Sequence, residues 1–273
     1  MTHTPDYTDK AATEFIEING MRLAYSQTGS GPLAIYAHGL TLSRASDRRL
    51  GLLDFSPIAA DHHLIAYDAR GHGESGVSRN PEDYTWPSLA DDLLALADRF
   101  SADQPISAIG TSMGTGTILH AVVKAPNRFG RLVLTAPPTA WEARANQAEV
   151  YERMAAILET SSSEAAAAVF SQIPAPSIFA DVSGYLSEPD VQPAVLPTVL
   201  RGAGRSNLPS REQLARITQP TLILSWATDP THPVAVAEEL ARMIPGARLH
   251  VSTTAADVRT WGERAAAFLA GKP

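Results

Sequence analysis

Short apolar runs alternate with segments of helical periodicity over the first half of the chain. Four runs have the length and composition of buried strands, at residues 33–37, 64–67, 106–109 and 132–134. Residues 86–100 and 113–123 instead carry apolar side chains at helical spacing, and two further strand-like segments flank Asn19-Gly20, a dipeptide typical of hairpin turns. This alternation predicts an α/β fold with a mostly parallel central sheet flanked by helices.

The pattern changes at Pro137-Pro138. Residues 140–217 contain helical segments, at 142–158 and 163–172, but no strand signal. Strand and helix signals then resume, at residues 221–226, 234–243 and 248–251, before a last helix that ends at Leu269. We therefore predict a single structural domain whose core is formed by residues 1–139 and 218–273, with residues 140–217 inserted as a small helical cap. Ligands of open α/β sheets bind outside the carboxyl ends of the strands, where such a cap would lie.

Composition and charge narrow the class of protein. The 273 residues include no cysteine, which excludes disulfides and thiolate metal sites. The net charge of −7 argues against binding to nucleic acid or to an anionic membrane surface. The N-terminus is polar and lacks the layout of a signal peptide, and no apolar run reaches the roughly 18 residues of a membrane span. We therefore expect a cytoplasmic protein, and the oligomeric state stays open.

The segment Gly110-Thr-Ser-Met-Gly114 has the pattern G-x-S-x-G, and its surroundings matter more than its letters. It follows an apolar strand and opens a helix, which is the arrangement of a nucleophile elbow. In so tight a turn the central residue takes a strained backbone conformation, and the flanking glycines avoid clashes. The Ser112 hydroxyl would then be exposed at the end of the strand, with a helix N-terminus behind it. We predict that Ser112 is a nucleophile.

This elbow is one of several motifs that give the chain a family resemblance over nearly its whole length. The motifs follow one another in a fixed order: His38-Gly39-Leu40, Asp68-Ala-Arg-Gly-His-Gly-Glu-Ser75, Gly110-Thr-Ser-Met-Gly114, and Thr228-Asp229 with Pro233. The order resembles that of the α/β-hydrolase fold family, and serine at the elbow resembles its esterase, lactonase and perhydrolase branch. The epoxide hydrolase and dehalogenase branches share the layout but carry aspartate there. The resemblance implies a hydrolytic enzyme, and this chemistry needs no metal or organic cofactor.

The remaining site residues are candidates for charge stabilisation and for the catalytic acid. The oxygen of a tetrahedral intermediate needs two donors about 3 Å away, and the backbone N–H of Met113 is placed to be one of them. The resemblance implies the backbone N–H of Leu40 as the other. It also places the acid in the loop after residues 221–226, where this chain has Asp229, although Ala227 stands where glycine is common. The alternative role for Asp229 is a cap of the helix that starts near Val234.

The family's histidine is missing from its usual place. The resemblance implies a base several residues after the last strand, near Ala256 or Asp257, and neither is histidine. Two substitutes remain, and the favoured one is His232, three residues after Asp229 in a loop at the strand ends, with pocket lining or helix entry as its alternative role. His250 lies about seven residues too early and is expected to pack within the sheet. Without a base, the hydroxyl of a serine is a poor nucleophile at neutral pH.

The other histidines are expected to be structural. His38 and His72 lie in the family's loop motifs, and His62 and His63 read as part of a solvated turn. His120 lies on the helix that follows Ser112, about 12 Å along its axis, which is too far to take the serine proton.

Together these residues predict a serine hydrolase of small or medium apolar carboxylic esters or lactones that works through an acyl-enzyme. Two alternatives stay open. The fold could bind a small apolar ligand without hydrolysing it, as the lost family histidine suggests, or it could use only the oxyanion site for non-hydrolytic chemistry such as a cyclisation. The retained elbow counts against a pure binding role, because a binding protein does not need an exposed serine in a strained turn.

Overall fold

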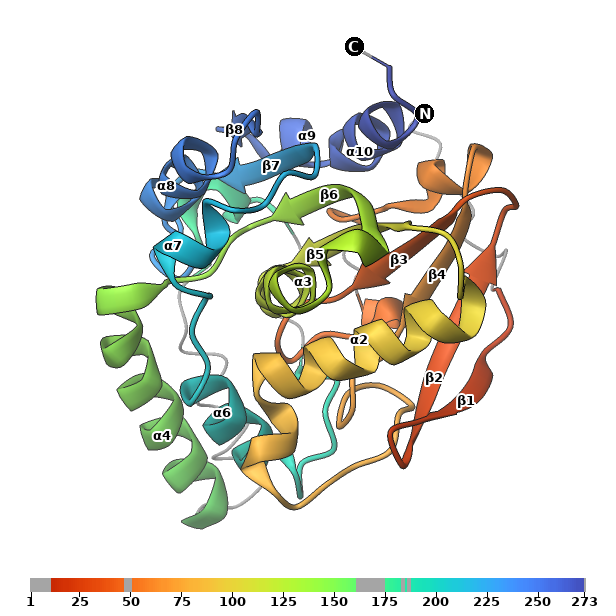
Figure 1. The fold of residues 1–273 in the computed structure, drawn as a ribbon. Helices are drawn as coiled ribbons and strands as arrows, with labels where there is room; N and C mark the ends of the chain where they lie inside the picture. Colours follow the sequence, from red (N-terminus) through yellow and green to blue (C-terminus); the bar gives the residue numbers. More distant parts are fainter. Residues whose placement is uncertain (1–10, 47–50, 161–174, 183–184, 186–187, 273) are drawn as a thin grey trace, which may run out of the picture.

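A computed structural model describes residues 11–46, 51–160, 175–182, 185 and 188–272. Its centre is an eight-stranded sheet in the order β1-β2-β4-β3-β5-β6-β7-β8 (Figure 1). The pairs β1–β2 and β2–β4 are antiparallel, and all later pairs are parallel, which confirms the predicted mostly parallel sheet. The strands are β1 (Glu14–Ile18), β2 (Met21–Thr28), β3 (Leu33–Ala37), β4 (His63–Tyr67), β5 (Ile106–Thr111), β6 (Phe129–Thr135), β7 (Thr221–Trp226) and β8 (Arg248–Ser252).

Burial along the strands follows their sequence patterns. Every residue of β3 and of β7 is buried, because these strands lie inside the sheet, are covered on both faces and are mostly apolar. The edge strand β1 instead alternates between more and less exposed positions. Its hairpin with β2 turns at Asn19 and Gly20, whose φ angles of 49° and 73° suit the two-residue turn that this dipeptide predicts.

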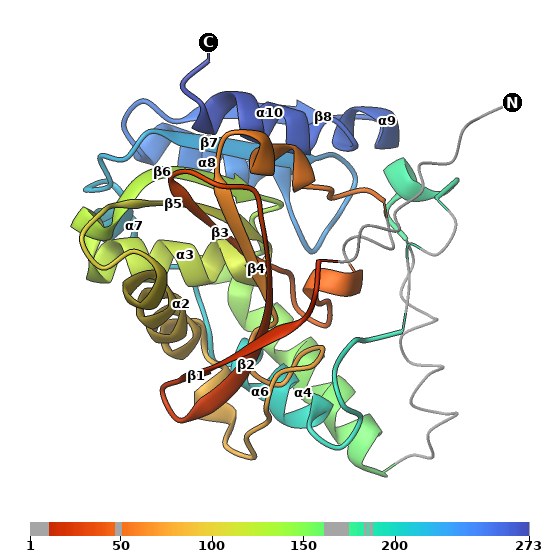
Figure 2. The same cartoon turned by 90° about the vertical axis from the view of Figure 1, so that its right-hand side faces the viewer.

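Helices cover both faces of the sheet. On one face α2 (Trp86–Phe100), α3 (Met113–Lys124) and α8 (Val234–Met243) enclose the larger apolar core. On the other face α10 (Trp261–Leu269) and the 3₁₀ helix η1 (Ser56–Ala60) pack against a second core (Figure 2). Shorter elements in this part of the chain include η2 (Pro81–Tyr84), η3 (Pro126–Arg128) and α9 (Ala255–Val258).

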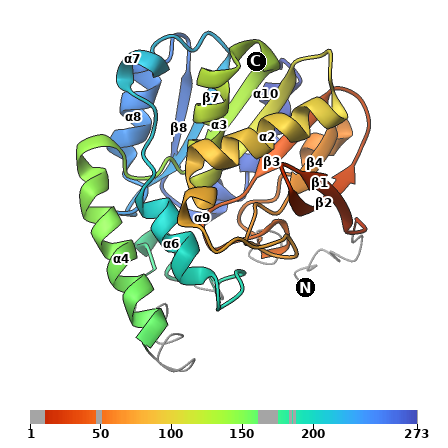
Figure 3. The ribbon, with the colours of Figure 1, turned by 60° about the horizontal axis from the view of Figure 1, so that its bottom comes forward.

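In the described chain between β6 and β7, helices joined by loops replace the strands, apart from an isolated bridge between Val191 and His72. Its elements are η4 (Trp141–Ala143), α4 (Arg144–Thr160), η5 (Ser177–Phe179), α6 (Leu196–Gly204) and α7 (Arg211–Leu214). Figure 3 shows α4 and α6 side by side. Arg201 of α6 holds this pair together through hydrogen bonds to Glu152 and Glu159 of α4. The helix expected at residues 163–172 lies outside the described residues.

Two local expectations were wrong. His62 is not in a solvated turn: its side chain is buried, and desolvation lowers its pKa. The reason is that the loop at Gly29 packs so closely that a Cβ there would lie 2.3 Å from the carbonyl oxygen of His62. His63 is the first residue of β4 and contacts the side chain of Gln27.

Among the described helices, none is both long and apolar enough to cross a membrane.

Candidate active site

Ser112 occupies the sharp turn between β5 and α3. Its φ of 52° and ψ of −106° lie outside the usual regions for a residue with a side chain, as expected for a nucleophile elbow. Gly110 and Gly114 make the turn possible, because a Cβ on Gly114 would lie 2.0 Å from the carbonyl oxygen of Ala37. A Cβ on Gly110 would lie 2.5 Å from the backbone of Gly114. Both glycines of the motif are therefore required by close backbone packing.

Hydroxyl groups from the helix and from β6 hold this turn. The Thr115 hydroxyl donates to the carbonyl oxygens of Gly110, at 2.8 Å, and Thr135, at 2.9 Å. The backbone N–H of Ser112 donates to the same Thr135 carbonyl, at 3.0 Å. Buried polar groups in such a network are all paired, which fixes the strained conformation of Ser112.

Replacing Gly114 by alanine is expected to lower the free energy of unfolding by about 3 kcal/mol or more, because the added methyl group overlaps the β3 backbone. Gly130→Ala is the matched control, since a Cβ at Gly130 would meet its nearest atom at 3.8 Å. Urea denaturation of the two variants measures the difference. Equal stability of the two variants would show that the turn relaxes without cost.

The structure brings Asp229 and His232 to Ser112. His232 Nε2 lies 2.8 Å from Ser112 Oγ, and His232 Nδ1 lies 2.7 Å from Asp229 Oδ2. With Nδ1 donating to the carboxylate, the neutral imidazole has Nε2 free to accept the serine proton. This is the hydrogen-bond geometry of a nucleophile, a base and an orienting acid.

A compact turn after β7 allows an acid and a base three residues apart to meet. Thr228 has a φ of 70°, so the chain bends sharply as it leaves the strand. The N–H of Thr231 then donates to Asp229 Oδ1, at 2.8 Å, and the N–H of His232 donates to the carbonyl of Asp229, at 3.3 Å. As a result, the imidazole of His232 lies against the carboxylate of Asp229. Asp229 therefore does not cap α8, whose N-cap position is Pro233.

The Asp229 carboxylate is buried but well supplied with donors. Burial alone would raise its pKa, but hydrogen bonds from His232, Thr231 and Trp226 outweigh burial and hold the pKa well below its usual range. The Trp226 indole N–H donates to Oδ2 at 2.9 Å, and the Thr231 hydroxyl donates to Oδ1 at 2.6 Å. Sequence reasoning missed both donors. The signal that could have found Trp226 is a tryptophan at the end of a buried strand, because its N–H needs a partner.

Two backbone N–H groups flank Ser112 as candidate oxyanion donors. Met113 begins α3, so its N–H has no partner within the helix. Leu40 follows Gly39, whose Cβ position would lie 3.7 Å from Ser112 Cβ, so the loop that carries Leu40 runs beside the nucleophile. Neither N–H donates to another residue in the described part of the chain. The oxyanion role of these two N–H groups stays a prediction.

His38 supports the loop of Leu40 and is not a candidate base. Its Nε2 accepts from the N–H of Ala69 at 2.9 Å, so its Nδ1 carries the proton and donates to the carbonyl of Gly39 at 2.8 Å. Burial lowers the pKa of His38 to about 4, which keeps the ring neutral. His72 packs beside it, with ring centroids 5.0 Å apart, and burial lowers its pKa to about 3.

The two remaining described histidines outside the site have other partners. His120 contacts the carbonyl of Asn207. His250 was expected to pack within the sheet, but its ring is about one-third exposed. Its Nε2 lies 2.7 Å from Asp257 Oδ2. It departs from the expectation because β8 is the edge strand of the sheet, so its residues are covered less.

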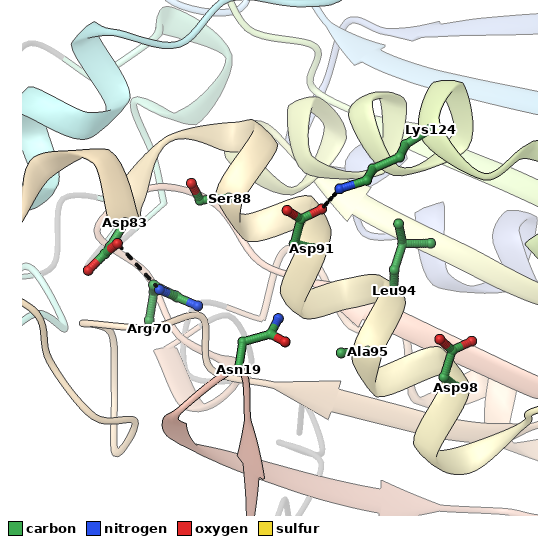
Figure 4. Close-up of a pocket in the computed structure, with 9 residues that line it drawn as sticks. All are labelled: Asn19, Arg70, Asp83, Ser88, Asp91, Leu94, Ala95, Asp98 and Lys124. Atoms are coloured by element: carbon green, nitrogen blue, oxygen red, sulfur yellow. Dashed lines mark hydrogen bonds and ion pairs between the residues drawn. The ribbon is translucent and has the colours of Figure 1, made fainter.

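A cavity of about 540 Å³ lies elsewhere, along α2 (Figure 4). Four of its charged side chains interact in pairs: Lys124 pairs with Asp91 at 2.5 Å, and Arg70 faces Asp83 at 3.9 Å. No residue of the Ser112 site lines it. Within the described residues, no group of three or more His, Cys, Asp or Glu side chains could hold a metal ion.

Known proteins share this architecture. A crystal structure of a hydrolase from Pseudomonas aeruginosa PA01 is 26% identical and superposes with a TM-score of 0.78, covering 96% of this chain and 98% of that one. An enol-lactonase from Burkholderia xenovorans LB400 is 22% identical, with a TM-score of 0.72 over 94% of this chain and 97% of that one, a likeness of fold alone.

Sequence relatives match over a shorter part of the chain. Proline iminopeptidase PfmaB of Pestalotiopsis fici is 31% identical over 130 residues, which are 45% of this chain and 44% of the relative. The match thus spans less than half the length of that curated relative. The sequence profile described as the alpha/beta hydrolase fold matches residues 32–257, from just before β3 into α9, and this range contains every candidate site residue. The chain therefore belongs to the α/β-hydrolase fold family.

Proposed function

We propose that this protein is a serine hydrolase of small or medium apolar carboxylic esters or lactones. One observation carries the proposal: a continuous line of hydrogen bonds from Ser112 Oγ through the His232 imidazole to the Asp229 carboxylate. The sequence suggested a ligand-binding or cyclase-like alternative because the family's histidine was missing. This reason for the alternative is weakened, because an imidazole from another loop, that of His232, contacts the serine.

The proposed reaction has two halves. Ser112 Oγ attacks the ester carbonyl carbon while His232 Nε2 takes the hydroxyl proton, and the N–H groups of Leu40 and Met113 stabilise the oxyanion. The carbon–oxygen bond to the leaving alcohol then breaks, and His232 returns the proton to that oxygen. In a lactone the alcohol stays attached to the acyl group. Water, deprotonated by His232, next attacks the acyl-enzyme and releases the acid and free Ser112.

We propose that the insertion at residues 140–217 acts as a cap over this site. Two of its segments contact loops that carry the proposed machinery. The N–H of Ile178 donates to the hydroxyl of Thr228, beside Asp229, at 3.2 Å. The N–H of Asp190 donates to the carbonyl of Thr41, beside Leu40, at 2.8 Å. A helical cover that contacts both loops supports a site for a small molecule.

The substrate class follows from the groups around the nucleophile. Leu40 and Met113 offer backbone donors to the oxyanion, and their side chains are apolar. The net charge of −7 gives no support for a polyanionic substrate such as nucleic acid. The likeness of fold to an enol-lactonase agrees with a lactone or ester as the substrate.

A fluorophosphonate probe tests the proposal without knowledge of the natural substrate. We expect the probe to label one residue, Ser112, because it reacts with activated serines beside oxyanion donors, and we expect Ser112→Ala to prevent labelling. Peptide mapping by mass spectrometry identifies the site. The same preparation should hydrolyse p-nitrophenyl butyrate or a small lactone. Stoichiometric labelling at another residue, or none in native protein, would contradict the proposal.

A further inference from the structure

Trp226, the last residue of β7, donates its indole N–H to the same carboxylate oxygen that His232 contacts. Trp226 Nε1 lies 2.9 Å from Asp229 Oδ2, and His232 Nδ1 lies 2.7 Å from that oxygen. The other oxygen, Oδ1, accepts the N–H and the hydroxyl of Thr231, at 2.8 Å and 2.6 Å. Each carboxylate oxygen therefore has two donors.

This arrangement leaves the carboxylate little freedom. An ionised carboxylate offers about four lone-pair sites, and here four donors occupy them. The carboxylate cannot rotate without breaking hydrogen bonds at both oxygens. Because the indole N–H shares Oδ2 with the imidazole, it also takes up part of the negative charge that faces His232.

Aromatic packing holds the Trp226 ring in place. Trp261 stacks on it with ring centroids 5.2 Å apart and an interplanar angle of 14°, and Phe179 of the insertion meets it edge-on at 5.0 Å. The His232 ring lies edge-on to it at 5.5 Å. The neighbouring Trp261 directs its own N–H to Ser252 Oγ, at 2.9 Å, and not to Asp229. Only one N–H of the stacked pair thus reaches the carboxylate.

We propose that Trp226 is a positioning residue that fixes the direction of the Asp229 carboxylate toward His232 and moderates its charge. This inference rests on the proposed function, since it assigns a role within the same hydrogen-bonded line. Its indole N–H is bonded to Asp229, while Ser112 is contacted by His232, so Trp226 acts through Asp229.

The test compares Trp226→Phe with Trp261→Phe, which removes the N–H from the other ring of the stack. In Trp226→Phe we expect kcat for an activated ester to fall about tenfold, the effect of one lost hydrogen bond to a charged group, with little change in KM. The acid limb of the kcat profile should move to higher pH, because the freed charge on Oδ2 favours protonated His232. Trp261→Phe should leave the acid limb in place. Identical profiles for the two variants, or a wild-type profile for Trp226→Phe, would overturn the proposal.

Other groups around the carboxylate do not obscure this readout. Burial, followed by the charge of Asp229, raises the pKa of Tyr185, so its hydroxyl stays neutral over the assay range. Thr231, which contacts Asp229, and Ser112, which contacts His232, carry hydroxyl groups that do not titrate there.

A second measurement needs neither a variant nor activity. The chain has four tryptophans, so the indole N–H region of a ¹H–¹⁵N spectrum is simple to follow through a pH titration. We expect the Trp226 signal to move with the protonation of His232, which is followed by the ring protons of His232. We expect the Trp261 signal to stay fixed. A Trp226 signal that does not respond would overturn the inference. Absent Ser112-dependent hydrolysis in the wild-type protein would instead count against the proposed function, while this titration still tests the Trp226 contact.

Discussion

Alanine in place of His232 is expected to lower kcat for an activated ester by about 10²- to 10⁴-fold, the usual range for loss of a general base. The imidazole is the group within hydrogen-bond distance of Ser112 Oγ, at 2.8 Å, that can accept its proton. Without it the hydroxyl is a poor nucleophile at neutral pH. In the wild-type protein, the rate should rise with pH through the range in which histidines titrate.

His250→Ala is the matched control for that variant. His250 also contacts a carboxylate, that of Asp257, and lies close in sequence to where the family's base is expected. Its substitution should affect stability more than rate, since the ring is bonded away from Ser112. Wild-type kcat/KM in His232→Ala, or a large loss of rate in His250→Ala, would contradict the assignment of the base.

Asparagine in place of Asp229 is expected to lower kcat by about 10⁴-fold. Its side-chain amide can donate to His232 Nδ1, which would place the proton of the neutral ring on Nε2 and leave no acceptor for the serine hydroxyl. Asp257→Asn, which alters the carboxylate paired with His250, should keep a rate near that of the wild type. Steady-state kinetics of the two variants would separate the proposed acid from the other histidine-bonded aspartate.

The Asp229→Asn substitution is also expected to change the pH dependence of the free energy of unfolding in a definite direction. Hydrogen bonds hold the pKa of Asp229 below its usual range, so the ionised carboxylate stabilises the folded state above the pKa of an unfolded aspartate, about 3.9. This contribution is lost as the pH falls through the lower, folded-state pKa. The difference in unfolding free energy between wild-type protein and Asp229→Asn should therefore be largest near neutral pH and shrink in acid. A difference that does not change with pH would show that the lost charge is not its cause.

Much of the fold was predictable because burial leaves a strong pattern. Residues 221–226 were expected as a strand and form β7, and the helices expected at residues 86–100 and 234–243 are α2 and α8. Strand beginnings were less certain: β6 starts at Phe129, three residues before the apolar run that revealed it. The earlier residues are held by pairing with β5, and such pairing is not visible in the sequence of one strand.

The site was predictable to the extent that topology determines it. Parallel strands bring their carboxyl ends to one edge of the sheet, so Ser112 after β5 and Asp229 after β7 were expected near one another. For His232 the sequence offered only its position in the same loop. Contact with Ser112 depends on the turn at Thr228, whose positive φ is uncommon for threonine and has no signal in the sequence. Trp226 escaped prediction because a tryptophan in a buried strand reads first as part of the core.

His232 is the group proposed to activate Ser112, and the pH dependence of labelling measures this activation directly. The quantity is the second-order rate constant for fluorophosphonate labelling of Ser112, determined across pH in wild-type protein and in His232→Ala. We expect the wild-type constant to rise with pH through the range in which histidines titrate. We expect the His232→Ala constant to be far lower at neutral pH and to lack this rise. Equal constants with the same pH dependence in both proteins would show that Ser112 is activated by another group, or not at all.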